Sequence, residues 1–157
     1  MYGPFLAPYL DRPVNLLEIG VFDGASLSLW QRLFPNHEKI VGLGYGIGGA
    51  VATGFKTVVS ETQVLYTGDQ SDAEVLRKMR EDLGEEERFD VIIDDGSQVP
   101  WHQIFTLETI FDTWLKPGGY TSSRTSRRRI GLLPRRTYTG MISSTLESAR
   151  RAVPWRS

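Results

Sequence analysis

The sequence contains no cysteine and no long apolar run, and after residue 120 it contains no lysine. The missing cysteine excludes disulfides, thiolate metal sites and cysteine nucleophiles, and it is typical of a cytoplasmic protein. No stretch approaches the roughly 20 apolar residues of a membrane span. The N-terminal residues also lack the basic region and apolar stretch of a signal peptide. We therefore expect a cytoplasmic protein that does not contact a membrane.

Charge is distributed unevenly along the 157 residues, although their formal sum is only −1. Residues 1–120 hold 9 basic and 18 acidic side chains, whereas residues 121–157 hold 9 arginines and one acid, Glu147. Hydrophobic residues make up 40% of the chain and aromatic residues 11%, enough for a packed core. Because one well-mixed globular surface rarely shows such a split, we expect an ordered domain over 1–120 and a basic tail over 121–157.

Short apolar runs alternate with amphipathic stretches throughout residues 1–120. The runs predict buried strands at Val14–Ile19, Lys39–Leu43, Gln63–Thr67 and Phe89–Ile93. Helical spacing predicts helices over residues 24–34, 72–83 and 101–114, the last with Ile104, Leu107, Phe111 and Trp114 facing inward. Such alternation predicts an α/β fold, a Rossmann-like parallel sheet of strand order 3-2-1-4 with helices on both faces. We expect the strands after Gly119 to be missing or scrambled, which would leave strand four as an exposed edge.

Polar residues and glycines gather where the predicted strands end, which is where open parallel sheets bind ligands. Gly20 and Gly24 follow strand one, but Phe22 stands where the dinucleotide fingerprint needs its second glycine. Asp69 and Gln70 follow strand three, and Asp94 and Asp95 end strand four. Adjacent carboxylates at the mouth of a buried strand need a cation or hydrogen-bond donors, and a hard cation such as Mg²⁺ would suit them. The alternatives are an ordinary tight turn after strand one, helix capping by Ser71 or Asp72, and two carboxylates that simply point into water.

Four sequence blocks carry a resemblance to a known family. They are Leu-Leu-Glu-Ile-Gly-Val-Phe-Asp-Gly-Ala-Ser-Leu at 16–27, Gly-Asp-Gln-Ser-Asp at 68–72, Phe-Asp-Val-Ile-Ile-Asp-Asp-Gly-Ser at 89–97 and Leu-Lys-Pro-Gly-Gly at 115–119. In this order and spacing they resemble the class I S-adenosylmethionine-dependent methyltransferases. More narrowly, they resemble the metal-dependent sugar O-methyltransferases of macrolide biosynthesis, the mycinamicin type.

The resemblance implies a function and a set of site residues. It implies methyl transfer from S-adenosylmethionine to a hydroxyl of a secondary-metabolite sugar or a similar small molecule. Glu18, Gly20 and Gly24 would lie beside the methionine part of the cofactor, Asp69 and Gln70 at the adenine edge, and Asp94 near the amino-acid moiety; Asp95 would be a magnesium ligand.

The sequence departs from the family pattern at three places. Gly44 stands at the end of strand two, where the family has an acid that holds the cofactor ribose. Gln98 replaces the histidine that would be the base, and an amide cannot accept a proton near neutral pH. His102 is the candidate substitute, although a histidine on a helix surface is more often merely solvated. A Glu-Asp pair that completes the metal site is absent after Tyr120. We therefore expect this chain to be a poor catalyst or inactive.

The tail after Tyr120 can be explained by a shift of reading frame. Residues 121–126 can be encoded so that the frame entered one base earlier reads Tyr-Ile-Ile-Glu-Asp-Leu, a buried strand that ends in the missing acidic pair. We therefore predict a frameshift near codon 120. The alternative is a genuine basic arm for nucleic acid or an anionic surface, which the lack of interleaved aromatic residues disfavours.

Two other functional classes stay open. One is a non-catalytic remnant of such an enzyme, and the other is a nucleotide-binding Rossmann oxidoreductase, which the residues at 22 and 44 disfavour. The sequence names neither the methyl acceptor nor the oligomeric state.

Overall fold

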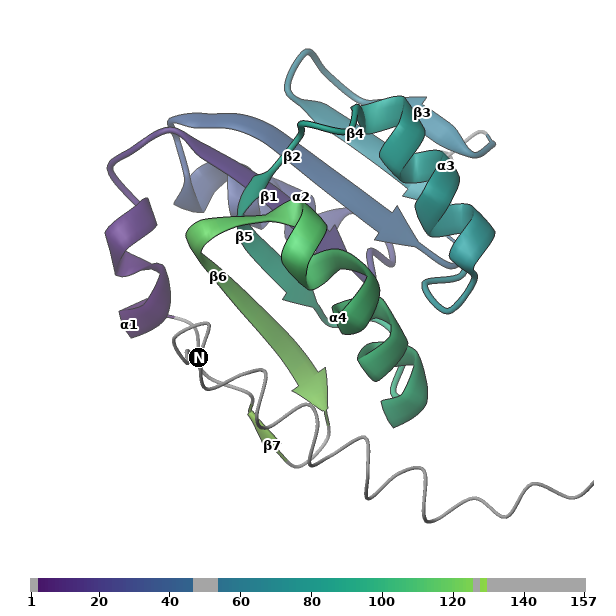
Figure 1. Ribbon diagram of the computed structural model, residues 1–157. Helices are drawn as coiled ribbons and strands as arrows, with labels where there is room; N and C mark the ends of the chain where they lie inside the picture. Colours follow the sequence, from purple (N-terminus) through teal and green to yellow (C-terminus); the bar gives the residue numbers. More distant parts are fainter. Residues whose placement is uncertain (1–2, 47–53, 126–127, 130–157) are drawn as a thin grey trace, which may run out of the picture.

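The computed structural model describes residues 3–46, 54–125 and 128–129. Its elements, in chain order, are α1 (Gly3–Leu6), the 3-10 turn η1 (Ala7–Tyr9), β1 (Val14–Ile19), α2 (Ala25–Leu33), β2 (His37–Gly44), β3 (Lys56–Val58), β4 (Gln63–Thr67), α3 (Ala73–Leu83), β5 (Phe89–Asp94), α4 (Pro100–Trp114), β6 (Leu115–Thr125) and β7 (Arg128–Arg129). The strand order is β3-β4-β2-β1-β5-β6-β7 (Figure 1). The predicted order 3-2-1-4 corresponds to β4-β2-β1-β5, whose neighbours all pair in parallel, and is confirmed.

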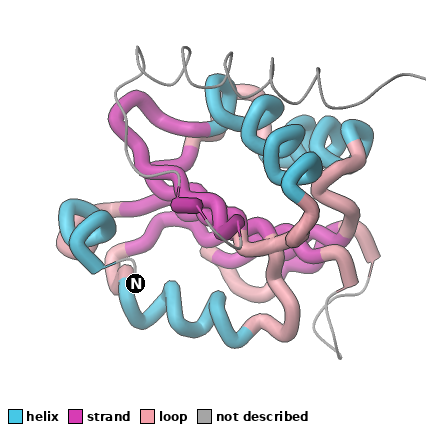
Figure 2. The backbone as a smooth tube through the Cα atoms, turned by 90° about the horizontal axis from the view of Figure 1, so that it is seen from below, coloured by secondary structure: helices cyan, strands magenta, loops and turns pink. Residues whose placement is uncertain are grey.

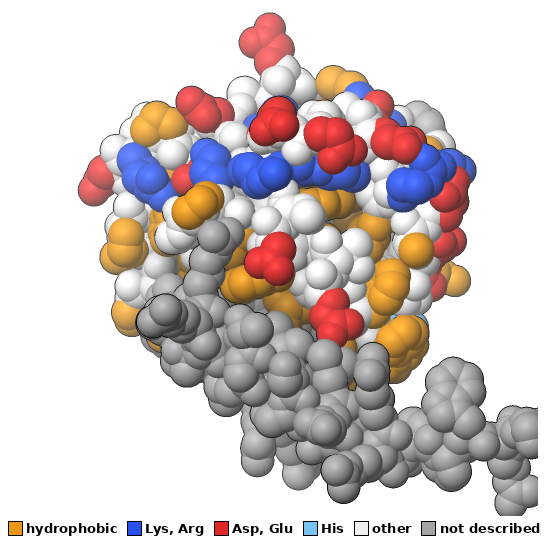
Figure 3. Space-filling model, viewed as in Figure 1, with side chains coloured by type: hydrophobic (Ala, Val, Ile, Leu, Met, Phe, Trp, Pro, Cys, Tyr) orange, Lys and Arg blue, Asp and Glu red, His pale blue; other side chains and the backbone are white. Residues whose placement is uncertain are grey.

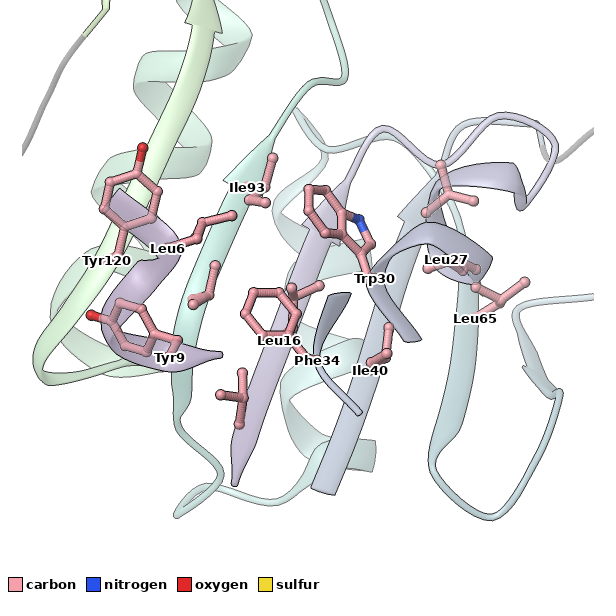
Figure 4. Close-up of a cluster of buried hydrophobic side chains, with 13 residues drawn as sticks. Leu6, Tyr9, Leu16, Leu27, Trp30, Phe34, Ile40, Leu65, Ile93 and Tyr120 are labelled. Atoms are coloured by element: carbon pink, nitrogen blue, oxygen red, sulfur yellow. The ribbon is translucent and has the colours of Figure 1, made fainter. Parts of the chain in front are cut away.

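Helices cover both faces of the sheet, as the end-on view in Figure 2 shows. Strand residues alternate between the faces, so that Leu16 and Leu17 belong to different hydrophobic clusters. One cluster receives Leu6 and Tyr9 from the N-terminal segment together with Trp30 from α2, side chains that Figure 4 shows facing the strands. The other cluster receives residues from α3 and α4. The sheet is therefore the middle of three layers.

β6 corrects the expectation that strand four is an exposed edge. Tyr120 to Ser123 pair in parallel with Val91 to Asp94, so β5 is an inner strand. Main-chain pairing does not depend on the side chains of this polar segment, while Leu115 and Tyr120 are buried and anchor it. β6 continues to Thr125, and most of the tail lies outside the described residues, so the division of the chain at residue 120 stays a prediction. The short antiparallel strand β3 was not predicted.

The buried face of α4 also differs from the prediction. Its buried residues are Gln103, Thr106, Ile110 and Trp114, whereas Ile104, Leu107 and Phe111 are only partly buried. Two polar side chains can occupy the inner face because both are hydrogen-bonded there, Gln103 to the Ser97 carbonyl and Thr106 to Gln70. The helix is thus rotated by about one residue relative to the face that hydropathy favours.

The N-terminal segment is held against β5 and β6 by polar contacts. Asp90, 3% exposed, pairs with Arg12 at 3.1 Å and with Lys116 at 2.8 Å. The Tyr9 hydroxyl donates to the Gly118 carbonyl at 3.1 Å, and Phe5 stacks on Tyr120. These contacts join the two ends of the described fold.

The surface of the α3 and α4 face mixes both signs of charge. Figure 3 shows Lys and Arg side chains in a row with Asp and Glu beside them. On α3, Arg77 pairs with Glu74 and Glu81. Within the described residues no helix is both long and apolar enough to pass through a bilayer.

Candidate functional site

A cavity of about 640 Å³ opens at the carboxyl ends of β1, β2, β4 and β5. It is lined by residues 19–22, 68–70 and 95–97 together with Leu43, Tyr45, Gly46 and His102. Its size is that of a small-molecule site. Because the strands are parallel, the loops that follow them meet at this one edge, where the sequence predicted a site.

Close packing of two backbones forms the floor between β1 and β5. A Cβ atom on Gly20 would lie 2.4 Å from the Gly96 Cα, and the φ of Gly20 is +106°. The Asp95 amide donates to the Ile19 carbonyl at 2.9 Å and holds the loops together. Position 20 therefore requires glycine, and a Cβ on Gly96 would lie 2.1 Å from Gln70 Oε1 and displace that side chain.

Glu18 and Gly24 lie beside the cavity and do not line it. Glu18 is 5% exposed, and its Oε2 accepts from Ser26 Oγ at 2.8 Å and from Trp30 Nε1 at 3.0 Å. Burial raises the pKa of Glu18, although both hydrogen bonds oppose that rise. Gly24 has a φ of +82° and precedes the first residue of α2. Glu18 therefore fastens α2 to β1, and Gly24 provides the left-handed backbone at the start of α2.

Asp69 lines the cavity with a charged carboxylate. Its Oδ1 accepts from the amide and the hydroxyl of Ser71, at 2.8 and 2.7 Å, and these bonds lower the Asp69 pKa. Asp72 caps α3 by accepting from the Glu74 amide, which confirms the helix-capping alternative for this residue. Oδ2 of Asp69 makes no hydrogen bond within the described residues and remains available to a ligand.

Gln70 is the centre of a buried polar network. Its Nε2 donates to both Asp94 carboxylate oxygens, at 3.3 and 3.2 Å, and to Thr106 Oγ1 at 3.1 Å. Its Oε1 accepts from the Ser97 amide at 2.6 Å. Burial raises the pKa of Asp94 to about 6, against the hydrogen bonds from Gly96 and Gln70. The carboxamide thus spans the space between the β4 and β5 loops, with both of its ends occupied.

The residues expected to carry the chemistry differ in where they lie relative to the cavity. Asp95 and His102 line the cavity, Asp94 is buried beneath it, and Gln98 is exposed outside it. His102 Nδ1 lies 2.9 Å from Ser97 Oγ. Sequence reasoning missed Ser97 and Thr106. The i, i+4 spacing of His102 and Thr106 on one helix was the available signal, since it puts them on the same face.

The end of β2 presents an aromatic ring in place of an acid. The Gly44 carbonyl accepts from the Gly68 amide at 2.9 Å, and Gly44 does not line the cavity. Tyr45, which follows it, lines the cavity and is 81% exposed, and Phe22 on the β1 loop is 75% exposed. The rim therefore offers apolar surface that was not predicted.

Three of the known proteins that are similar in sequence to this chain are named as O-methyltransferases. No protein-family profile matches it. It is 35% identical over 125 residues to an 8-demethyl-8-alpha-L-rhamnosyl tetracenomycin-C 2'-O-methyltransferase of Streptomyces olivaceus. It is 32% identical over 126 residues to an L-olivosyl-oleandolide 3-O-methyltransferase of Streptomyces antibioticus and, over the same length, to a mycinamicin VI 2''-O-methyltransferase of Micromonospora griseorubida. These matches cover about three quarters of this chain but only 28–30% of each relative.

A solved structure agrees with this similarity. The MycE methyltransferase of the mycinamycin pathway, in complex with Mg and SAH, superimposes with a TM-score of 0.61 and 27% identity, over 99% of this chain and 37% of that one. The fold of this chain thus resembles part of that enzyme. The chain is a homologue of the sugar O-methyltransferases of macrolide and polyketide biosynthesis, and it spans about a third of their length.

Proposed function

We propose that this chain is the cofactor-binding part of an S-adenosylmethionine-dependent O-methyltransferase whose acceptor is a hydroxyl on a secondary-metabolite sugar. One observation carries the proposal: the cavity is lined by three of the four sequence blocks that resemble the family. The loops 19–22, 68–70 and 95–97 converge from strands far apart in sequence. We place the reaction in the cytoplasm, as expected for a biosynthetic enzyme.

The cofactor would be held mainly by backbone and by Asp69. Gly20 and Gly96 line the cavity with main chain, and Oδ2 of Asp69 can accept from an amino or hydroxyl group. Gln70 supports this site by holding Ser97 and Asp94, since its amide is already hydrogen-bonded. When bound, the cofactor supplies the electrophilic methyl group.

His102 is the residue that can take the proton of the acceptor hydroxyl. It lines the cavity, whereas Gln98 is exposed and has no basic atom. Proton removal by a positioned imidazole contributes about 10²–10⁴-fold in rate. His102 is thus a candidate base that lies four residues after Gln98, the position at which the family pattern has histidine.

The described residues do not make a complete magnesium site. Asp95 stands at the cavity, but the described part of the chain contains no group of three His, Asp or Glu side chains able to hold a metal. Mg²⁺ is usually held by one or two carboxylates together with waters and substrate oxygens, and the family pattern adds a Glu-Asp pair that is absent here. We therefore derive no step of the reaction through a metal.

Calorimetry with S-adenosylmethionine, S-adenosylhomocysteine and NAD tests the proposal. We expect binding of the first two and none of NAD. Asp69→Asn should weaken binding by about tenfold, the cost of one charged hydrogen bond. The matched control is Asp112→Asn, on the exposed side of α4, which should leave binding unchanged. Binding of neither ligand class would identify a remnant, and binding of NAD alone would identify an oxidoreductase; both outcomes would refute the proposal.

A further inference from the structure

Ser97 and His102 form a hydrogen-bonded pair inside the cavity. Ser97 Oγ lies 2.9 Å from His102 Nδ1, and both residues line the cavity. Ser97 follows the Gly96 turn after β5, and its amide is held by Gln70 Oε1 at 2.6 Å. His102 is in the first turn of α4, and its carbonyl accepts from Thr106 Oγ1 at 2.8 Å. Both members of the pair are thus fixed by the buried network.

The other contacts of Ser97 favour one direction for this hydrogen bond. Ser97 Oγ also accepts from the Val99 amide, at 3.2 Å. A hydroxyl has one proton and two lone pairs. If Ser97 donates to Nδ1, the Val99 amide, the hydroxyl and the imidazole form one continuous chain in which each donor is used. The opposite direction would make Oγ accept twice and would leave its proton without an acceptor in the described residues.

The chain's other histidine has the opposite arrangement. His37 Nδ1 lies 2.7 Å from the Phe34 carbonyl, which can only accept, so Nδ1 carries the proton. His37 Nε2 then accepts from Thr62 Oγ1 at 3.0 Å. The sequence contains only these two histidines, and their hydrogen-bond partners assign them opposite tautomers.

We propose that Ser97 fixes His102 as the Nε2–H tautomer, so that the basic lone pair is on Nδ1 and is reached through the Ser97 hydroxyl. The inference rests on the proposed function and gives Ser97 a role in it. The acceptor hydroxyl passes its proton to Ser97 Oγ while Ser97 passes its own proton to His102 Nδ1. The acceptor oxygen forms the new bond to the methyl carbon, the carbon–sulfur bond breaks, and its electron pair stays on sulfur.

Proton-coupled ¹⁵N spectra of the two imidazole rings test the tautomer without substrate. The spectra are recorded at about pH 8.5, two units above the usual pKa of a free imidazole, about 6.5. We expect His102 to carry its proton on Nε2 and His37 on Nδ1, with His37→Gln identifying the signals. Ser97→Ala should convert His102 to a mixture of tautomers, Ser97→Thr should preserve the single form, and the unchanged His37 signal reports that the fold is intact.

The result that overturns the proposal is Nδ1–H at His102 in the unmodified chain. A tautomer that does not respond to Ser97→Ala in a folded protein would also overturn it. This measurement is independent of methyl transfer, so its outcome stands even if the chain fails to bind S-adenosylmethionine and the proposed function falls. In an active chain, Ser97→Ala should lower kcat by about 10²-fold, with the KM for the cofactor unchanged, and Ser97→Thr should restore it.

Discussion

Thr106 should contribute more to stability than any other threonine on α4, because it alone joins the helix to the β4 loop. Thr106 is fully buried; its Oγ1 accepts from Gln70 Nε2 and lies within 3.1 Å of the Gln70 carbonyl. Thr106→Val keeps the shape but leaves one N–H of the Gln70 side-chain amide without a partner. Buried groups left in this way cost about 1–3 kcal/mol, and the added methyl group returns less than about 1 kcal/mol. We expect a net loss of about 2 kcal/mol.

Thr113→Val is the matched control. Thr113 is exposed on the same helix and makes the same bond to the carbonyl four residues earlier, that of Thr109. Helix propensity and the loss of this local bond therefore cancel when the two variants are compared. Urea denaturation should show Thr106→Val to be less stable than Thr113→Val by about 2 kcal/mol, or by about 4–8 °C in Tm. If the two variants differ by less than about 0.5 kcal/mol, the buried network does not stabilise the fold and the reasoning is wrong.

Three further predictions follow from the site. Burial raises the pKa of Asp94 to about 6 in the folded chain, so the contribution of Asp94 to stability should fall as pH rises from 4 to 7. In urea titrations, Asp94→Asn should remove about 2–3 kcal/mol of this pH dependence. Parallel curves of stability against pH for the two proteins would contradict the prediction. Gly20→Ala combines a φ of +106° with a 2.4 Å overlap on backbone, so thermal melting should show a Tm at least several degrees lower. The resemblance implies a Glu-Asp pair at the end of the fifth strand, and Ser123 of that strand pairs with Asp94. Calorimetry should detect Mg²⁺ binding in an Arg124→Glu, Thr125→Asp double variant, and should lose it when Asp95→Asn is added.

The strands β1, β2, β4 and β5 and their order could be predicted because each contains a short, largely buried apolar run. The position of the cavity followed from the same reasoning, since parallel strands end at one edge. The inner face of α4 could not be predicted in this way. Hydropathy favours Ile104, whereas the structure buries Gln103 and Thr106, whose partners are 6 and 36 residues distant in sequence.

The roles of individual side chains in the site were harder to predict from the sequence than the location of the site. Gln70 has the chemistry of a ligand-binding amide, but the folded chain uses both of its ends to hold neighbouring loops. The relation of Ser97 to His102 depends on the turn between β5 and α4, which sequence spacing alone does not define. β6 could not be foreseen from its polar residues, because main-chain pairing and two buried side chains form it.

The contacts between the N-terminal segment and β6 also determine when the fold can be completed. Tyr9 and Gly118 are separated by 109 positions, and Asp90 joins Arg12 to Lys116 across a similar span. Such long loops must close before their contacts contribute any stability, and this slows folding. During synthesis, the first dozen residues could make these contacts only after β6 has been synthesised. A change in the chain near residue 120 would therefore affect the folding of its beginning as well as its end.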